Sequence, residues 1–231
     1  MTVEERLMKF FNSFHNIYRD NYRRRVELLL VAYEGDVKGI SAIDRKLVNN
    51  LLEVMRELRT ARGSTLHKMR DFILKYRDNY DFIYVVDGLG LPELYGLWCE
   101  AGKKRLLPVL KVFVNMEAST RAFKEVFKCE DLACVAREVQ GMVLKKTDVL
   151  IHDVMSEEPR SQDEIINLIV ARVKYVTLEL PLVEGNTMIL SDHGYDIVRV
   201  NSKYIVTHTR DRGAHLILAK IAPVVLLKRI H

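Results

Sequence analysis

Four polar residues stand directly after three short apolar segments of the sequence. Asp87 follows FIYVV, Asp153 follows VLIH, and Asp192 and His193 follow TMILS. A short apolar run bounded by turn residues is typical of a buried β-strand. If the three strands are parallel, their carboxyl ends lie at one edge of the sheet and bring these side chains together. Carboxylates gathered in this way repel one another, and a divalent cation relieves that repulsion.

The types of these side chains indicate which cations would bind. Carboxylate oxygens together with an imidazole nitrogen suit Zn²⁺, Mn²⁺, Fe²⁺ or Mg²⁺. The alternative for each aspartate is an ordinary N-cap at a strand-to-helix turn. Three such turns in one chain, one of them carrying Asp-His-Gly, favour a metal site. We therefore predict one or two divalent ions, Zn or Mn or else Mg.

The elements that position these residues are predicted from the hydrophobic pattern. Apolar residues recur at helical spacing over residues 3–32, 41–62 and 65–76, so residues 1–80 form a helical N-terminal region. After Tyr80, short apolar strands alternate with helical segments. This alternation predicts an α/β domain over residues 81–231, with a mostly parallel sheet sandwiched by helices.

The charge of the chain is concentrated at its start. The formal net charge is +5, and residues 1–80 hold 16 Lys and Arg against 11 Asp and Glu, including Arg23, Arg24 and Arg25 in a row. A basic helical face is able to bind nucleic acid or an acidic protein. The alternative is a solvated helix surface, because no groove-reading motif accompanies the charge.

Composition also suggests a compartment. The sequence contains no apolar run of the roughly 18 residues that a membrane-spanning helix needs, and MTVEERLMKFF does not resemble a secretory signal. The three cysteines show no CxxC spacing, which predicts neither a disulfide framework nor a zinc knuckle. We expect a cytoplasmic protein without membrane contact. Glutamine occurs only twice while Lys, Arg and Glu are abundant, as is typical of thermophilic proteins.

Two of these segments carry a family resemblance. FIYVVDGLG followed far downstream by ILSDHGYDI resembles the alkaline phosphatase superfamily, and within it the PglZ-like branch. The similarity covers roughly residue 81 to the end and leaves the N-terminal helices unexplained. It implies an alkaline-phosphatase-like core, two metal ions and a Thr or Ser nucleophile that attacks phosphate esters or phosphodiesters.

The resemblance also implies roles for particular residues. Asp87, Asp192 and His193 would hold one metal together with the nucleophile, and Asp153 and a late histidine would hold the other. The nucleophile should follow the second strand at a helix N-terminus, which favours anions. Thr120 is preferred for this place and Ser119 is the second choice. An N-cap is the alternative role for either hydroxyl.

The sequence departs from the family pattern at the second metal. Four residues after Asp153 the family has a histidine, and here Glu157 stands in its place, which would favour Mn or Mg over Zn. Asp148 and His152 show the same spacing but lie within the predicted strand. The late histidine is His215 or His208, with His215 favoured because it precedes the strand containing Pro223.

Two arginines close to these histidines suggest substrate binding. Arg210 and Arg212 are able to bind an anionic, phosphate-containing substrate. Their alternative role is a basic surface turn.

Three readings of the function follow. The first is a metal-dependent hydrolase of phosphate esters or phosphodiesters. The second is a catalytically degenerate PglZ-like binding module within a defence-type multi-protein assembly, which the missing histidine and the basic helices favour. The third is a structural α/β domain whose three strand-end aspartates are only caps, and this reading predicts no bound metal.

Overall fold

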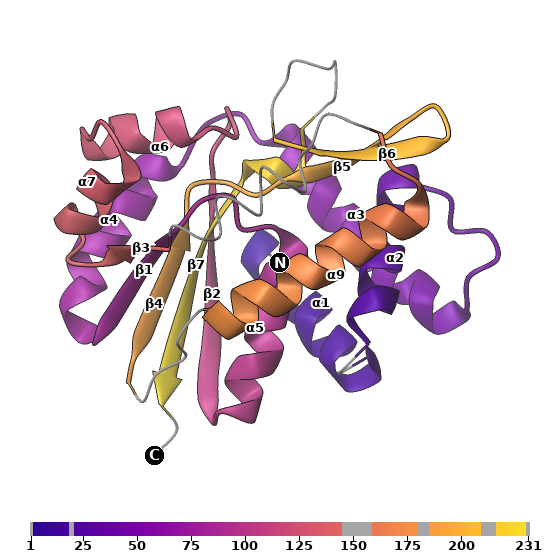
Figure 1. The fold of residues 1–231 in the computed structure, drawn as a ribbon, viewed down its shortest axis with the longest axis horizontal. Coiled ribbons are helices and arrows are strands. Elements are labelled where there is room, and N and C mark those ends of the chain that lie inside the picture. The colour runs from indigo at the N-terminus through magenta and orange to yellow at the C-terminus, as the bar shows by residue number, and fades with distance from the viewer. Residues whose placement is uncertain (1, 19–20, 145–158, 180–184, 209–215, 230–231) are drawn as a thin grey trace.

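The structure is a computed structural model of the 231-residue chain. It describes residues 2–18, 21–144, 159–179, 185–208 and 216–229. The predicted strand that contains Asp153 lies outside the described residues. The fold consists of a five-stranded sheet with helices on both faces and a separate two-stranded hairpin (Figure 1).

The N-terminal region is helical, as predicted, but its first segment is two helices rather than one. The helices are α1 (Val3–Tyr18), α2 (Tyr22–Glu34), α3 (Ala42–Thr60) and α4 (Leu66–Tyr76), and the 3-10 helix η1 (Arg77–Asn79) follows α4. Asn21 begins α2 because its side chain accepts a hydrogen bond from the backbone N–H of Arg24. Ser41 caps α3 in the same way through the N–H of Asp44. Hydrophobic periodicity continues across residue 21, so it does not reveal this break.

The sheet is mixed. Its strands stand in the order β2-β7-β4-β1-β3, with the bounds β1 (Phe82–Val86), β2 (Leu106–Val114), β3 (Met142–Val143), β4 (Thr187–Ser191) and β7 (Ile221–Arg229). β1 pairs in parallel with β3 and β4, whereas β7 is antiparallel to both β2 and β4. Within this described sheet, β7 alone therefore runs against the direction of the others. The prediction of a mostly parallel sheet is corrected in one respect, which is the antiparallel direction of β7. The apolar content of a strand does not determine its direction.

Both faces of the sheet are buried. Along β1, Tyr84 and Val86 face the side covered by α1, α2, α3, α5 (Leu91–Lys103) and α9 (Gln162–Glu179). Ile83 and Val85 face the other side, which α4, α6 (Thr120–Phe127) and α7 (Leu132–Glu138) cover (Figure 1). Burial on both faces is why the strands read as continuous apolar runs.

The N-terminal helices share a core with the sheet. Phe11 of α1 lies against Tyr95 and Trp98 of α5, with ring centroids 5.8 Å apart in each pair. The same apolar cluster continues to β1 and β4. None of the helices in the described part of the chain is long and apolar enough to cross a lipid bilayer.

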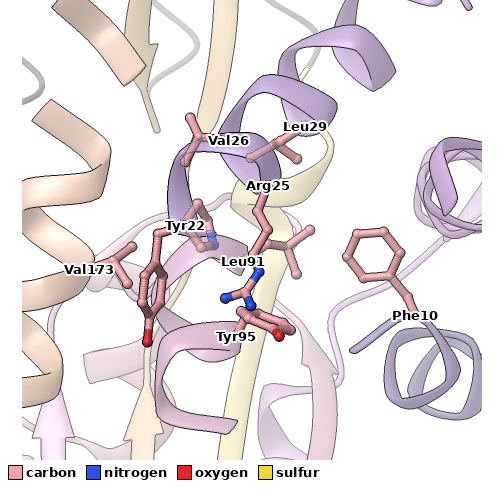
Figure 2. A pocket seen from close by; sticks show the side chains of 9 residues that line it. Phe10, Tyr22, Arg25, Val26, Leu29, Leu91, Tyr95 and Val173 are labelled. Carbon is pink, nitrogen blue, oxygen red and sulfur yellow. The ribbon is translucent and has the colours of Figure 1, made fainter. Parts of the chain in front are cut away.

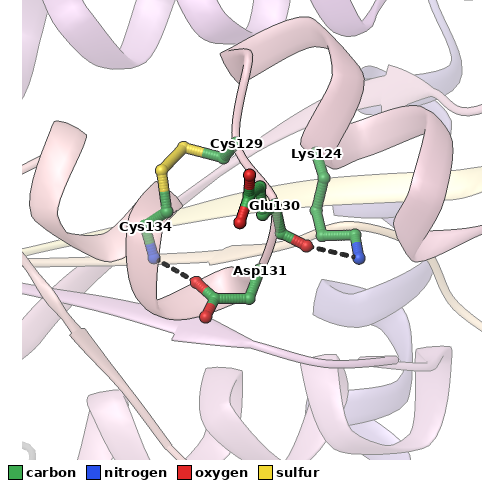
Figure 3. Close-up of a disulfide and its surroundings, with 5 residues drawn as sticks. All are labelled: Lys124, Cys129, Glu130, Asp131 and Cys134. Carbon is green, nitrogen blue, oxygen red and sulfur yellow. Dashed lines mark hydrogen bonds between the residues drawn. A yellow bond between two sulfur atoms is a disulfide. The ribbon is translucent and has the colours of Figure 1, made fainter.

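Residues 119–139, which the sequence presents as one helical pattern, form two helices joined by a disulfide (Figure 3). Lys128 ends α6 in the left-handed conformation, and Asp131 begins α7 by accepting a hydrogen bond from the N–H of Cys134. The turn brings Cys129 and Cys134 to a Cα separation of 5.5 Å, within the range that a disulfide spans. The expectation that the cysteines form no disulfide is therefore wrong, because the turn was not predicted.

This disulfide gives a stability prediction. Cys129→Ser should lower the free energy of unfolding by about 2 kcal/mol, since the bridge closes a short loop in the unfolded chain. Urea unfolding under oxidising conditions measures the difference. A reducing agent should lower the free energy of unfolding of the wild-type protein to that of the variant. Equal stability of the two proteins under oxidising conditions would contradict the prediction.

Candidate metal centre

Three strands that run in the same direction end at one edge of the sheet. Asp87 follows β1, Asp192 follows β4, and Asn115 begins the connection from β2 to α6. β1 and β4 are neighbours, and Val86 is in register with Ser191. The aspartates that follow these two residues are therefore adjacent, as the strand-end argument predicts.

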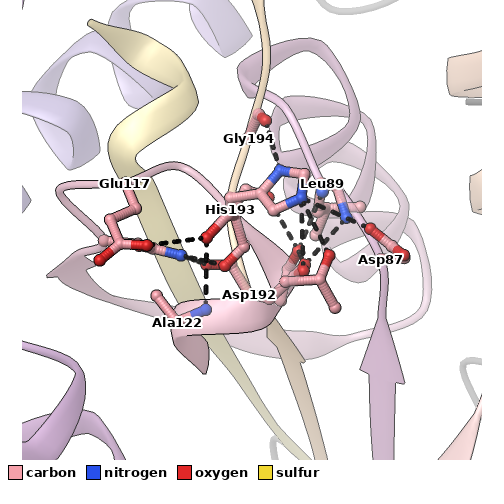
Figure 4. Close-up of polar contacts among 12 residues, drawn as sticks. Asp87, Leu89, Glu117, Ala122, Asp192, His193 and Gly194 are labelled. Atoms are coloured by element: carbon pink, nitrogen blue, oxygen red, sulfur yellow. Dashed lines mark hydrogen bonds and ion pairs between the residues drawn. The ribbon is translucent and has the colours of Figure 1, made fainter. Parts of the chain in front are cut away.

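Asp87, Asp192 and His193 form a compact cluster (Figure 4). His193 Nε2 lies 3.3 Å from Asp192 Oδ2 and 3.6 Å from Asp87 Oδ1. One ligand atom from each residue falls within 4.8 Å of the other two. The side chains of Asp192 and His193 are fully buried, and that of Asp87 is 21% exposed. Two carboxylates and one imidazole thus converge on one point at the border of the protein interior.

The hydrogen bond at Nδ1 of His193 determines which ring nitrogen carries the proton. Nδ1 lies 2.7 Å from the carbonyl oxygen of Gly194. A carbonyl only accepts, so Nδ1 must carry the proton. In the neutral imidazole, Nε2 then has a free lone pair directed at the two aspartates. Metal-binding histidines are commonly fixed in this way by a backbone carbonyl.

The two oxygens of Asp192 have different surroundings. Oδ1 accepts hydrogen bonds from the N–H of Gly88 at 3.1 Å and from Ser191 Oγ at 3.3 Å. Oδ2 is buried and has no hydrogen-bond donor among the residues that the structure describes. A buried carboxylate oxygen without a donor is costly. Oδ2 also faces the lone pair of His193 Nε2, so a cation satisfies both atoms. The residues present therefore fit a divalent metal.

Within the described part of the chain, the cluster offers three possible protein ligands. Structural zinc sites usually have four protein ligands, whereas catalytic sites have three and keep a position open. The exposed side of Asp87 is where such a position would be reached from solvent. The arrangement is thus suited to catalysis as well as to metal binding.

The two candidate nucleophiles are distinguished by their contacts. Ser119 Oγ accepts a hydrogen bond from the N–H of Ala122, which makes Ser119 the N-cap of α6. Thr120 Oγ1 lies 3.4 Å from His193 Nε2. Ala118, just before them, holds a left-handed backbone with φ of +51°, and such strain is often found at functional sites. Thr120 is the hydroxyl that faces the cluster.

Asn115 connects the loop before α6 to the cluster of Asp87, Asp192 and His193. It is fully buried, and its Nδ2 donates to the backbone oxygens of Ser119 at 2.8 Å and of Asp192 at 3.0 Å. The amide group of Asn115 therefore fixes the position of Ser119 relative to Asp192. The sequence analysis did not identify Asn115, although a lone amide directly after an apolar strand was a usable signal.

The segment after the cluster is anchored by Asp196. Its carboxylate accepts three backbone N–H bonds, from Ile217 at 2.7 Å, Leu218 at 3.0 Å and Ala219 at 3.0 Å. These residues belong to the turn and 3-10 helix η2 (Leu218–Lys220) before β7. Burial raises the pKa of Asp196, while the three N–H donors act in the opposite direction. Asp196 also starts the hairpin of β5 (Asp196–Val200) and β6 (Lys203–Thr207).

His208 lies beside the cluster but is not part of it. Its ring stacks on that of His193, with centroids 4.6 Å apart and planes 15° from parallel. The other predicted second-metal ligands, Asp153, Glu157 and His215, lie outside the described residues, as do Asp148 and His152. The predicted substrate-binding residues Arg210 and Arg212 do so as well. Among the described residues, the cluster could hold one metal ion.

The arginine triplet is engaged within the chain. Arg23 pairs with Glu27 and Asp163, and Arg24 pairs with Glu27 and Asp44. Arg25 is buried, with its guanidinium 3.5 Å from the centroid of the Tyr95 ring, in a pocket between α2 and α5 (Figure 2). The run of three arginines is therefore not a free basic face, and a nucleic-acid or protein partner of the N-terminal helices stays a prediction.

Comparisons with protein-family models, with curated proteins and with solved structures find no match to this chain.

Proposed function

We propose that this chain is a metal-dependent hydrolase of phosphate esters or phosphodiesters, with Thr120 as the nucleophile. The observation that carries the proposal is the convergence of Asp87, Asp192 and His193 with the Thr120 hydroxyl at the N-terminus of α6. A hydroxyl beside a helix N-terminus lies where anions are stabilised. A phosphate group bound there would present its phosphorus to Thr120.

Each residue has a separate task in this proposal. Asp87 Oδ1, Asp192 Oδ2 and His193 Nε2 would hold the metal, and Gly194 keeps His193 in the ligating tautomer. Asn115 fixes the distance between the Thr120 loop and Asp192. When bound, the metal would supply charge stabilisation and a lowered hydroxyl pKa. No general base is then needed beside Thr120.

The family resemblance supports the same proposal. FIYVVDGLG and ILSDHGYDI, the two segments that carry the resemblance, also supply the three clustered residues. We extend the proposal to a PglZ-like member of that superfamily, with Zn or Mn as the preferred metal. A cytoplasmic, thermophilic setting belongs to the proposal too, since intracellular proteins of hyperthermophiles often contain disulfides.

The direct test is a hydrolysis assay of the wild-type protein. p-Nitrophenyl phosphate and bis(p-nitrophenyl) phosphate report on phosphomonoester and phosphodiester cleavage. We expect turnover of at least one of them with Mn²⁺ or Zn²⁺, loss of turnover with EDTA and recovery when metal is restored. Turnover that survives chelation would contradict the proposal. Bound metal without any turnover would favour the binding-module reading instead.

A further inference from the structure

A buried ion pair joins α5 and α9 beneath the metal cluster. Arg172 Nε lies 2.8 Å from Glu93 Oε1, and the two side chains are 1% and 0% exposed. Tyr195 adds a third member, since its hydroxyl donates to the same oxygen at 2.9 Å. Burial, and then the Glu93 carboxylate, raise the pKa of Tyr195 well above its usual value, so the phenol keeps its proton.

Packing alone does not explain these charges. Removing an arginine and a glutamate from water costs several kcal/mol per ion, and apolar residues of similar volume often replace such pairs without loss of stability. The neighbours of Arg172 in the core, such as Ile169, Val173 and Val176, are apolar. A donor at position 172 therefore has a purpose beyond filling space.

That purpose is visible in the remaining contact of the guanidinium. Arg172 Nη2 donates to the carbonyl oxygen of Gly88 at 2.7 Å. Gly88 has a φ of +61°, a conformation that favours glycine. The N–H of Gly88 donates to Asp192 Oδ1, and Gly88 directly follows Asp87. Arg172 thus holds Gly88, which is covalently linked to Asp87 and hydrogen-bonded to Asp192.

A second bond tethers the same loop from the other strand. The N–H of Leu89 donates to Ser191 Oγ at 2.9 Å, and Ser191 Oγ lies within hydrogen-bond distance of Asp192 Oδ1. The loop after β1 and the loop after β4 are therefore joined by hydrogen bonds from Gly88 and Leu89. Arg172 connects the first of these loops to α9.

We propose that Arg172, held by Glu93 and Tyr195, is a positioning residue of the metal site. It fixes the Gly88 carbonyl so that the Gly88 N–H orients Asp192 while Asp87 faces His193. This inference rests on the proposed function, because it assumes that the cluster binds metal. Residues in this position behind metal ligands commonly change affinity 10–100-fold when they are replaced.

The test compares Mn²⁺ affinity among variants of the full chain, by isothermal titration calorimetry well below each melting temperature. Arg172→Met, made together with Glu93→Gln so that no lone charge stays buried, should weaken Mn²⁺ binding by roughly 10–100-fold. Arg172→Lys should weaken it about 10-fold, because one ammonium cannot reproduce the planar fork that serves both Glu93 and Gly88.

A control on the same helix separates positioning from stability. Val173 is equally buried and its side chain lies against Gly96 of α5. Val173→Ala should lower the melting temperature and leave Mn²⁺ affinity within about twofold of wild type. Wild-type affinity in Arg172→Lys or in the double variant would overturn the inference, as would an equal loss in Val173→Ala. If the double variant does not fold, Arg172→Lys decides the question.

The same titration distinguishes the two proposals. A wild-type protein that binds neither Mn²⁺ nor, in the same titration, Zn²⁺ would overturn the proposed function together with the inference. A wild-type protein that binds Mn²⁺, with Arg172 variants that bind it equally well, would overturn the inference alone.

Discussion

Asp192→Asn should remove the bound metal and with it the hydrolytic activity. The substitution is nearly isosteric and keeps an oxygen able to accept from the Gly88 N–H. The amide group would then face His193 Nε2, at the place where Asp192 Oδ2 has no hydrogen-bond donor from the described residues. Only two ligands would remain, so we expect metal content measured by elemental mass spectrometry to fall from about one equivalent to near zero. Turnover should fall at least about 1,000-fold.

Asp196→Asn is the matched control for this variant. Asp196 is a buried aspartate four residues further along, and its carboxylate accepts from backbone N–H groups instead of facing the cluster. In this variant the side-chain NH₂ group would face a backbone N–H group, so two hydrogen-bond donors would meet. The free energy of unfolding should therefore fall by about 1–3 kcal/mol. Metal content should stay at the wild-type level. Retained metal in Asp192→Asn, or equal loss of metal in both variants, would contradict the assignment of Asp192.

Thr120→Ala should abolish turnover while the metal stays bound. Thr120 Oγ1 lies 3.4 Å from His193 Nε2, and the carboxylate and imidazole ligand atoms of Asp87, Asp192 and His193 all remain in this variant. Removing a nucleophile that forms a covalent intermediate typically costs many orders of magnitude, so we expect at least a 1,000-fold lower kcat with unchanged metal content. Thr120→Ser, which keeps a hydroxyl, should retain part of the activity.

Ser119→Ala tests the alternative nucleophile. Its hydroxyl caps α6, so the variant should lose about 1 kcal/mol of stability. Its kcat should stay within about tenfold of wild type. A kcat that falls 1,000-fold in Ser119→Ala but not in Thr120→Ala would assign the chemistry to Ser119.

The sequence predicts that Asp87 and Asp192 lie close together, because two local signals suffice for it. Asp87 and Asp192 each follow an apolar strand, and neighbouring parallel strands bring their ends together. The helices predicted over residues 41–62 and 65–76 are confirmed as α3 and α4. Ser119 and Thr120 could not be separated by sequence, because the choice depends on which hydroxyl accepts from Ala122.

The supporting residues depend on contacts between distant segments. Arg172 lies 84 residues from Gly88, and Asn115 lies 77 residues from Asp192. Arg172 in LIVARVKYV and Glu93 in LPELYGLWC are charged residues on apolar helices. This pattern shows that the two residues are unusual, but it does not indicate which residues they contact. The reversed direction of β7 and the Cys129–Cys134 bridge follow from turns that periodicity does not reveal.

Both proposals depend on a metal ion bound between Asp87, Asp192 and His193. Anomalous X-ray diffraction from crystals grown with Mn²⁺ or Zn²⁺ locates such an ion. We expect an anomalous peak at about 2.0–2.2 Å from Asp87 Oδ1, Asp192 Oδ2 and His193 Nε2. A site without any peak at saturating metal, or a peak held by other residues with these three left uncoordinated, would contradict it.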